Sequence, residues 1–491
     1  MEEKRRKRIL LLAVFAILNL CFYGIFCVEH FAADTYLTEV WGWEKISKLY
    51  WQNGRWLMTL LCEICQAFHI GFHAEKTISW VLAISFLSLA ELLLYEIIKR
   101  RIHVKETLNI KHILVFLSSF MMISNLFVLE YFIFAEYTGA ICVGIFFNIL
   151  EVRLVLKFLE RGEIKDYILG LVCGIFGIMG HQGAFGITAV LLILLAENTF
   201  LNVKNFIKNS IIIGMAYLVP ALTNTLQTKL AGSARVAGSL DVVGALKTAM
   251  EQIGDLLIST ANFMPKSLYL VLCGVAGMVV LVMIIVKRKG KALLHAAYVF
   301  LVFILAGVAP FLMTDTAYIS VVPRTVYVLG AGFPVLLILL LLLENLSKKL
   351  LQGVVLYAGI FLGTQYFNTC QIETSHYVSN GIDYYDVNYI EQQVWIYENE
   401  TGNQISKIKI YTDESPLGIY YNLTGYGAVN ERVMSNSWAA ADAYRIFTGR
   451  EMTVEESDAE VYEKYFKGKN WHYLDDEQIV LIGDTLHLCL Y

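Results

Sequence analysis

Long apolar runs recur along most of the chain and are separated by short polar segments. An α-helix needs about 20 mostly apolar residues to cross the hydrocarbon core of a bilayer, which predicts about eleven membrane-spanning helices. They lie near residues 9–28, 77–98, 111–129, 138–158, 165–180, 183–198, 209–228, 267–286, 292–313, 325–345 and 350–367. The predicted fold class is therefore an all-α polytopic membrane protein, whose first helix is a retained signal anchor after the basic start MEEKRRKR.

Basic residues gather in the short loops on one side of this arrangement. These loops contain Lys4 to Arg8, the segment 99–105, Lys157 to Lys165, Lys204 with Lys208, the segment 287–291, and Lys348 with Lys349. If each predicted helix crosses the membrane once, all of these basic loops lie on the same side, and the positive-inside rule makes that side cytoplasmic. We expect a multi-pass protein of the cell (plasma or inner) membrane with a cytoplasmic N-terminus.

This parity also assigns two segments to the outer surface. The apolar stretch from Arg55 to Phe72 cannot be a further span without placing the basic segment 99–105 outside, so we interpret it as a juxtamembrane helix. The first outer loop then covers residues 29–76. A second long outer loop, 230–266, contains an amphipathic helix that starts near Asp241. Together these parts form a transmembrane domain over residues 1–367.

Residues 368–491 form a more polar tail with twenty acidic and eight basic residues, a balance that fits an extracytoplasmic location. KIKIYT at 407–412 alternates like a strand, and IVLIGDTLHLCLY at 479–491 predicts a hairpin that turns at Gly483 and Asp484. Thr453 and Glu456 have the spacing of a capping box before a helix. We therefore expect a small C-terminal α/β domain.

Composition supports the membrane class and limits the chemistry. Hydrophobic residues make up 57% of the chain and charged residues 17%. The mean hydropathy is +0.56. The net charge of −4 says little, because charge is distributed here by side rather than by total, and the lack of a basic–aromatic stripe argues against a nucleic-acid partner. The sequence contains no Walker, dinucleotide-binding or HExxH pattern, and the C-x-x-C at Cys62 and Cys65 is interpreted as membrane-facing packing.

Ionisable residues near the outer ends of the helices are the candidates for chemistry, because charges near membrane depth are costly. They are Glu29, His30, Asp34, Arg55, Glu130, Glu136, His181, Arg235, Asp315 and Arg324. A sugar carried on a polyprenyl phosphate has a stable anion as its leaving group, so transfer needs a carboxylate base and cations rather than a general acid. Asp34 would be the base, and Arg324 with Arg235 or Arg55 would bind the phosphate.

Several short motifs carry a resemblance. They are FAADTY with Asp34, the N-G-R-W-L run at Asn53 to Leu57, LEYF with Glu130, the His181-Gln182 pair, and Pro323-Arg324. With these motifs the chain resembles the GT-C class of polytopic glycosyltransferases that use polyprenyl-phosphate sugars, and it is most similar to bacterial membrane glucosyltransferases that modify surface polysaccharides.

The resemblance implies transfer of a glucose-like hexose from a polyprenyl-phosphate donor to a surface glycan. It implies Asp34 as the catalytic residue, and as substrate-binding residues Arg324, Glu130, Arg55, His181, Gln182, Arg235 and Glu29. Many GT-C members have paired acidic residues in the first loop. Here Ala33 precedes Asp34, which leaves Glu29 or Glu39 as the second carboxylate. No metal ligand and no cofactor is assigned, and dependence on a divalent cation is left open.

Other interpretations of the same residues remain. Asp34 is also suited to cap a helix over TYLTEVWGW, and Arg324 to anchor the next span at the interface. A transporter or flippase of lipid-linked glycans would need charges at the mid-depth of several spans, whereas we expect Glu91 and Glu151 near helix ends. A scaffold whose tail binds a partner is the third reading.

Overall fold

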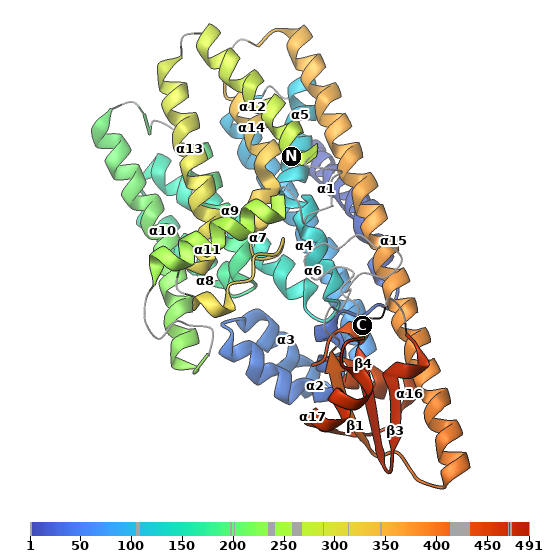
Figure 1. Cartoon of the computed structure of the whole chain (residues 1–491). Coiled ribbons are helices and arrows are strands. Elements are labelled where there is room, and N and C mark those ends of the chain that lie inside the picture. Colours follow the sequence, from blue (N-terminus) through green and yellow to red (C-terminus); the bar gives the residue numbers. More distant parts are fainter. Residues whose placement is uncertain are drawn as a thin grey trace. The chain divides into compact units, whose positions relative to one another are not determined.

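The computed structural model is mostly helical and has a small four-stranded sheet near the C-terminus (Figure 1). It describes residues 2–104, 109–196, 199–200, 202–233, 241–257, 268–287, 289–312, 314–343, 346–412, 433–469, 471 and 474–490. The chain divides into two compact units. The first comprises Met1–Cys27, Trp43–Phe132 and Glu136–Thr369, and the second comprises Val28–Gly42, Ile133–Ala135 and Cys370–Tyr491.

Among the described residues, eight helices are long and apolar enough to cross a membrane. They are α1 with the 3-10 turn η1 (Glu2–Cys27), α4 (Phe72–Arg101), α5 to α6 (Ile110–Ile133), α7 (Thr138–Arg161), α10 (Val203–Leu230), α12 (Leu268–Val286), α13 with η5 (Gly290–Phe311) and α15 (Lys348–Thr401). Three further expected spans are shorter helices, namely α8 (Ile164–Ile178), α9 (Gln182–Leu195) and η7 with α14 (Tyr327–Leu341). The count of about eleven crossings therefore stays a prediction.

Both helices expected in the long polar loops are present. The apolar stretch after Arg55 forms α3 (Trp56–Ala67). The amphipathic helix of the second loop is α11 (Val242–Asp255), and the carboxylate of Asp241 caps it by accepting a hydrogen bond from the Gly244 N–H at 2.8 Å. Their position at the membrane surface stays a prediction.

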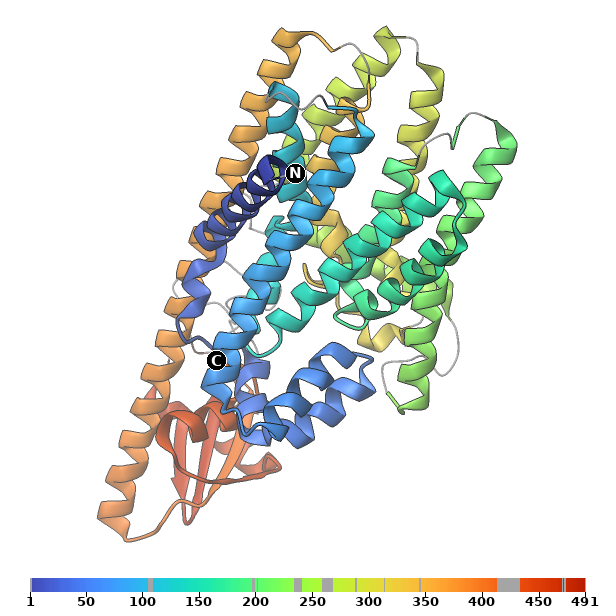
Figure 2. The ribbon, with the colours of Figure 1, turned by 180° about the vertical axis from the view of Figure 1, so that it is seen from behind.

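Small residues and buried polar groups pack the helices of the first unit. A Cβ on Gly144 of α7 would lie 2.9 Å from the Gly177 carbonyl of α8, so glycine permits the close approach of these two helices. Figure 2 shows α1, in dark blue, beside the lighter α4. Between them Asn19 donates a hydrogen bond to Glu91 at 2.9 Å, and Ser124 donates to the other carboxylate oxygen at 2.6 Å.

Two buried carboxylates lie deeper in their helices than the sequence predicted. Glu91 and Glu151 do not lie near helix ends: Glu151 is at the centre of α7, Glu91 is well inside α4, and both are fully buried. A Cβ on Gly174 would lie 2.4 Å from a carboxylate oxygen of Glu151, so that side chain fills a space that only glycine leaves on α8. The mean hydropathy of a predicted span does not reveal such positions, because one carboxylate barely changes a mean taken over about 20 residues.

The second unit contains a sheet with the strand order β2-β1-β4-β3. Strand β1 (Lys407–Thr412) pairs in parallel with β2 (Thr453–Glu455) and β4 (Thr485–Leu490), while β3 (Ile479–Ile482) and β4 form an antiparallel hairpin. The strand and hairpin expectations are confirmed. The capping box is wrong, because Thr453 belongs to β2 and Asp458 caps the short α17 (Ala459–Val461).

Part of the first polar loop belongs to this second unit. Phe31, Ala33 and Tyr36 pack in one hydrophobic core with Val394 of α15 and Leu486 of β4. The sequence-based division placed residues 29–42 with the transmembrane domain. The chain leaves the second unit after Gly42, where α2 (Ala33–Gln52) is broken by a φ of 71° and a ψ of 168°, a conformation that essentially only glycine adopts.

His487 makes the stability of the sheet dependent on pH. The Tyr411 hydroxyl accepts a hydrogen bond from the Asp458 N–H at 3.1 Å, so its own proton points to Nδ1 of His487, 2.8 Å away. This contact needs a neutral imidazole. Burial, reinforced by the charge of Lys409, lowers the pKa of His487.

We predict that β4 loses protection from hydrogen exchange as the pH falls below about 6.5, the ordinary histidine pKa. Below this pH, His487 is protonated in the unfolded state but stays neutral in the folded state. Acidification therefore stabilises the unfolded state and lowers the free energy of unfolding. Exchange in β4 peptides of the full chain, followed by mass spectrometry, measures this. His487→Gln should give a flatter pH profile; an unchanged profile would contradict the assignment.

Candidate active site

A break between two helices positions Glu130. The Asn125 side chain after α5 accepts a hydrogen bond from the Phe127 N–H at 2.9 Å, and the chain restarts as α6 (Leu129–Ile133) with Glu130 in its first turn. The Glu130 side chain is fully buried. One carboxylate oxygen accepts the Arg324 backbone N–H at 2.6 Å, and the other accepts the Arg324 guanidinium. The carboxylate therefore holds both the charge and the backbone of Arg324.

Tyr131 and the start of α9 contact the backbone of Arg324. The Tyr131 hydroxyl donates to the Arg324 carbonyl at 2.7 Å, and its ring lies 5.3 Å from that of His181. His181 caps α9 through Nδ1, which accepts the Gly183 N–H at 3.2 Å. A Cβ on Gly183 would lie 2.2 Å from the Arg324 carbonyl oxygen, so this approach requires glycine.

Arg55 follows a tight turn that docks against α9 and α10. Gly54 has a φ of 73°, and a Cβ there would lie 2.7 Å from the Asn224 side-chain nitrogen. The Gln182 amide donates to the Asn53 carbonyl at 2.8 Å, and the Asn224 amide donates to the Gly54 carbonyl at 2.8 Å. The N-G-R run is thus held on both sides by side-chain amides.

Side chains of α10 also hold this turn, although no sequence motif pointed to them. Asn224 also accepts from Gln182 at 3.2 Å, and Gln227 donates to the Trp51 carbonyl at 2.6 Å. Asn224, Gln227 and Thr228 lie on one face of α10, and this helical spacing is the signal that marks them.

Arg55 differs from Arg324 because it has no carboxylate partner among the described residues. Its half-buried side chain has a buried Nε without a hydrogen-bond partner, and no carboxylate of the described residues forms an ion pair with it. Arg55 is the N-cap of α3, and the Leu57 N–H contacts the carbonyl of Met179, the C-cap of α8, at 3.4 Å. The Arg55 guanidinium therefore lies at the N-terminus of α3, whose dipole also favours an anion.

Five of the expected site residues thus come together in the first unit. We call Arg55, Glu130, Tyr131, His181, Gln182 and Arg324 the polar cluster. Both Arg55 and Arg324 act electrostatically on the Tyr131 hydroxyl. Arg235 lies outside the described residues.

Asp34 and Glu29 belong to the second unit. Asp34 lies in the first turn of α2, after its first residue Ala33, so the helix-cap interpretation is wrong. Its half-buried carboxylate has no hydrogen bond or ion pair to any described residue; only its backbone carbonyl is bound, by the Thr38 hydroxyl at 2.8 Å. The carboxylate is available for a substrate.

The two proposed partner carboxylates lie elsewhere. Burial raises the pKa of Tyr36, with further contributions from the charges of Asp383, Glu39 and Glu29, so these acids surround the Tyr36 hydroxyl. At about 100° per residue, Tyr36 and Glu39 are on the face of α2 turned away from Asp34. Glu39 therefore does not form a pair with Asp34.

The remaining candidates have structural contacts. Asp315 caps the turn η6 (Thr316–Tyr318) by accepting the Ala317 N–H at 3.0 Å. His30 is buried, with Nδ1 2.9 Å from the Val28 carbonyl. Glu136 is buried beside Glu75.

Cys62 and Cys65 of the C-x-x-C pair are buried inside the protein on α3, so they pack against other parts of the chain and the membrane-facing interpretation is wrong. Burial raises the pKa of Cys65 to about 11 and raises that of Cys62 further, so neither thiol is a thiolate at neutral pH. In the part of the chain that the structure describes, no group of three or more His, Cys, Asp or Glu side chains is arranged to hold a metal ion.

These features describe a helical protein with several candidate membrane spans and a polar cluster that contains two arginines. The chain belongs to the GtrII family of glucosyltransferases: the model described as Glucosyl transferase GtrII matches residues 44–337. It is consistent with a bacterial membrane glucosyltransferase of the GT-C type, which confirms the resemblance seen in the sequence. No curated protein matches the chain. The matched part contains the polar cluster, whereas Asp34 precedes it.

We predict that Glu130→Gln destabilises the protein by about 3 kcal/mol, because it leaves the partly buried Arg324 without its counter-charge. Thermal unfolding of the purified protein measures the change. Glu251→Gln, which breaks an exposed ion pair with Lys247, is the control and should cost less than about 1 kcal/mol.

Adding Arg324→Gln to Glu130→Gln should recover part of the loss, since the unpaired charge is then removed. A double variant as unstable as the sum of the single ones would show that the pair contributes nothing.

Proposed function

We propose that this glucosyltransferase transfers glucose from a polyprenyl-phosphate donor to a surface glycan or glycopolymer on the outer face of the cell membrane. Family membership provides the glucosyl transfer, and with it a sugar donor and a glycan acceptor. The lipid carrier, the side of the membrane and the roles of individual residues are parts of the proposal.

The observation that carries the donor assignment is the environment of Arg55. A guanidinium with a buried, unpartnered Nε at the N-terminus of α3 is suited to a phosphate, whose oxygens accept several charge-assisted hydrogen bonds. Arg324 is already neutralised by Glu130, so Arg55 is the better candidate for the leaving phosphate, and Arg324 stabilises the surrounding structure.

Asp34 is proposed as the base. The acceptor hydroxyl attacks the anomeric carbon of glucose, and its proton passes to the Asp34 carboxylate. The bond between the anomeric carbon and the phosphate oxygen breaks, and its electron pair leaves with the polyprenyl phosphate. Phosphate is stable as an anion, so the leaving group needs cations and not a proton donor.

The proposed topology follows from the basic loops. With the eight long helices and the three shorter apolar ones as crossings, the clusters at Lys4 to Arg8 and at Lys348 with Lys349 fall on the cytoplasmic side. The N-terminus is then cytoplasmic, and the α/β domain after residue 368 is extracytoplasmic, on the side where surface glycans are modified.

A flippase of lipid-linked glycans is the second candidate, and the fully buried Glu91 and Glu151 are the observation that favours it. Against it, Glu91 is hydrogen-bonded by Asn19 and Ser124, and Glu151 fits against Gly174, so each is part of helix packing. A flippase would accumulate lipid-linked precursor on the inner leaflet when it is inactivated.

We predict that Arg55→Gln weakens binding of the donor, because it removes charge-assisted hydrogen bonds to the phosphate. The KM for the donor should rise by about 10- to 100-fold with a smaller change for the acceptor. Arg55→Lys should be intermediate, since it keeps the charge and loses the planar fork. Arg153→Gln, at an exposed arginine of α7, is the control. An unchanged KM for Arg55→Gln would overturn the phosphate assignment.

We predict that Asp34→Asn lowers the rate of glucosyl transfer by about 100- to 10,000-fold, the usual contribution of a general base. Glucose content of the surface glycan and transfer by the purified enzyme both measure this. Asp241→Asn keeps the cap of α11 and should transfer normally. Normal transfer by Asp34→Asn at normal protein level would remove Asp34 from the mechanism.

A further inference from the structure

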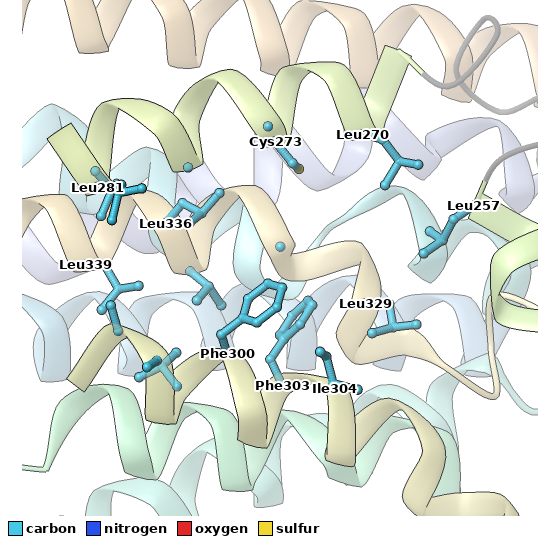
Figure 3. A pocket seen from close by; sticks show the side chains of 18 of the residues that line it. Leu257, Leu270, Cys273, Leu281, Phe300, Phe303, Ile304, Leu329, Leu336 and Leu339 are labelled. Carbon is cyan, nitrogen blue, oxygen red and sulfur yellow. The ribbon is translucent and has the colours of Figure 1, made fainter. Parts of the chain in front are cut away.

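An apolar groove runs between α12, α13 and α14 in the first unit, and α11 borders it (Figure 3). Its volume is about 760 Å³, and its walls include Leu270, Leu281, Phe300, Phe303, Leu336 and Leu339. The hydroxyl of Tyr269, which also borders it, is used internally: it donates to the Leu329 carbonyl at 2.7 Å and accepts the Gly332 N–H at 3.0 Å. The lining therefore suits a hydrocarbon.

The shape of the groove suits a long chain. Its lining on α12 extends from Tyr269 to Ile284, which is about 22 Å along the helix axis. This is most of the thickness of a hydrocarbon core, about 30 Å. Phe300 is 62% exposed and Leu281 is 46% exposed, so the groove is open along α12 and α13, two of the candidate membrane spans.

One end of the groove is built by the segment that carries Arg324. Leu329 of η7 (Tyr327–Ala331) lines the groove five residues after Arg324. On α11, Met250 and Ile253 line the same groove. Between them Gln252 donates to the Ile319 carbonyl at 3.2 Å and accepts the Val321 N–H at 2.9 Å. An apolar chain bound at this end would therefore contact the segment that carries Arg324, a residue of the polar cluster.

We propose that this groove binds the isoprenoid chain of the donor, with its phosphate toward the polar cluster. This rests on the proposed function. The groove has the length and apolarity that an isoprenoid chain requires, and one end is formed by the segment that carries Arg324. A phospholipid acyl chain is the competing occupant, and the test separates the two.

Gly274 permits a test that fills the groove without disturbing its walls. Gly274 lines the groove, and no atom lies within 4 Å of a Cβ built there. Gly274→Leu should weaken binding of polyprenyl phosphate by about tenfold, because the side chain occupies the path of the lipid. Gly214→Leu is the matched control: Gly214 lies within α10, is equally open, and does not line the groove.

The measurement uses the purified full chain and two lipids, polyprenyl phosphate and phosphatidylglycerol, with binding followed by native mass spectrometry. A selective loss of polyprenyl phosphate in Gly274→Leu supports the proposal. Unchanged binding overturns it. An equal loss of both lipids also overturns it, since the groove would then be a general lipid site.

Gly277→Leu is the second variant should Gly274→Leu fail to fold; the nearest atom to its Cβ is 3.9 Å away, on Leu336. Glucosyl transfer from polyprenyl-phosphate glucose is measured separately on the unmodified protein. Selective binding without transfer supports the groove and overturns the proposed function. Transfer that survives in both groove variants overturns the groove and leaves the function standing.

Discussion

The buried pair of Glu130 and Arg324 is the constraint on which the polar cluster depends. It joins residues 194 positions apart, and the same carboxylate binds the backbone N–H of Arg324. With its carbonyl held by Tyr131, the Arg324 backbone has little freedom. The start of α9 packs directly on it and tolerates only glycine at 183. A buried ion pair is an uncertain source of stability, but it defines one arrangement well, because each partner is costly to leave alone.

In this arrangement one arginine is paired with a carboxylate and the other is not. Arg324, just before η7, is paired with Glu130, whereas Arg55 is held by its backbone turn and its guanidinium has no carboxylate partner among the described residues. Such a pairing would suit a site that binds and releases an anion, because the paired Arg324 keeps its position when the anion leaves.

Sequence patterns predicted the local features well. The alternation of 407–412 and the turn at Gly483 were enough for β1 and the hairpin, and the spacing after Asp241 was enough for α11. The capping box at Thr453 failed because pairing with β1 overrides a local cap signal. The sequence also named Arg55, Glu130 and Arg324, but not that Glu130 would neutralise Arg324, nor that Asn224 and Gln227 bind backbone far along the chain. Such partners depend on tertiary contacts, which periodicity does not report.

The neutralisation of Arg324 has a consequence for the type of donor. A sugar linked through a single phosphodiester brings one negative charge, and a sugar linked through a pyrophosphate brings two. Within the described part of the polar cluster, Arg55 is the guanidinium without a carboxylate partner, so the charge available there balances one phosphate. Desolvating a second, unbalanced charge at membrane depth is expensive. Under the proposed role of Arg55, this charge balance favours a donor with a single phosphate over a donor with a pyrophosphate, before any contact with the sugar ring is made.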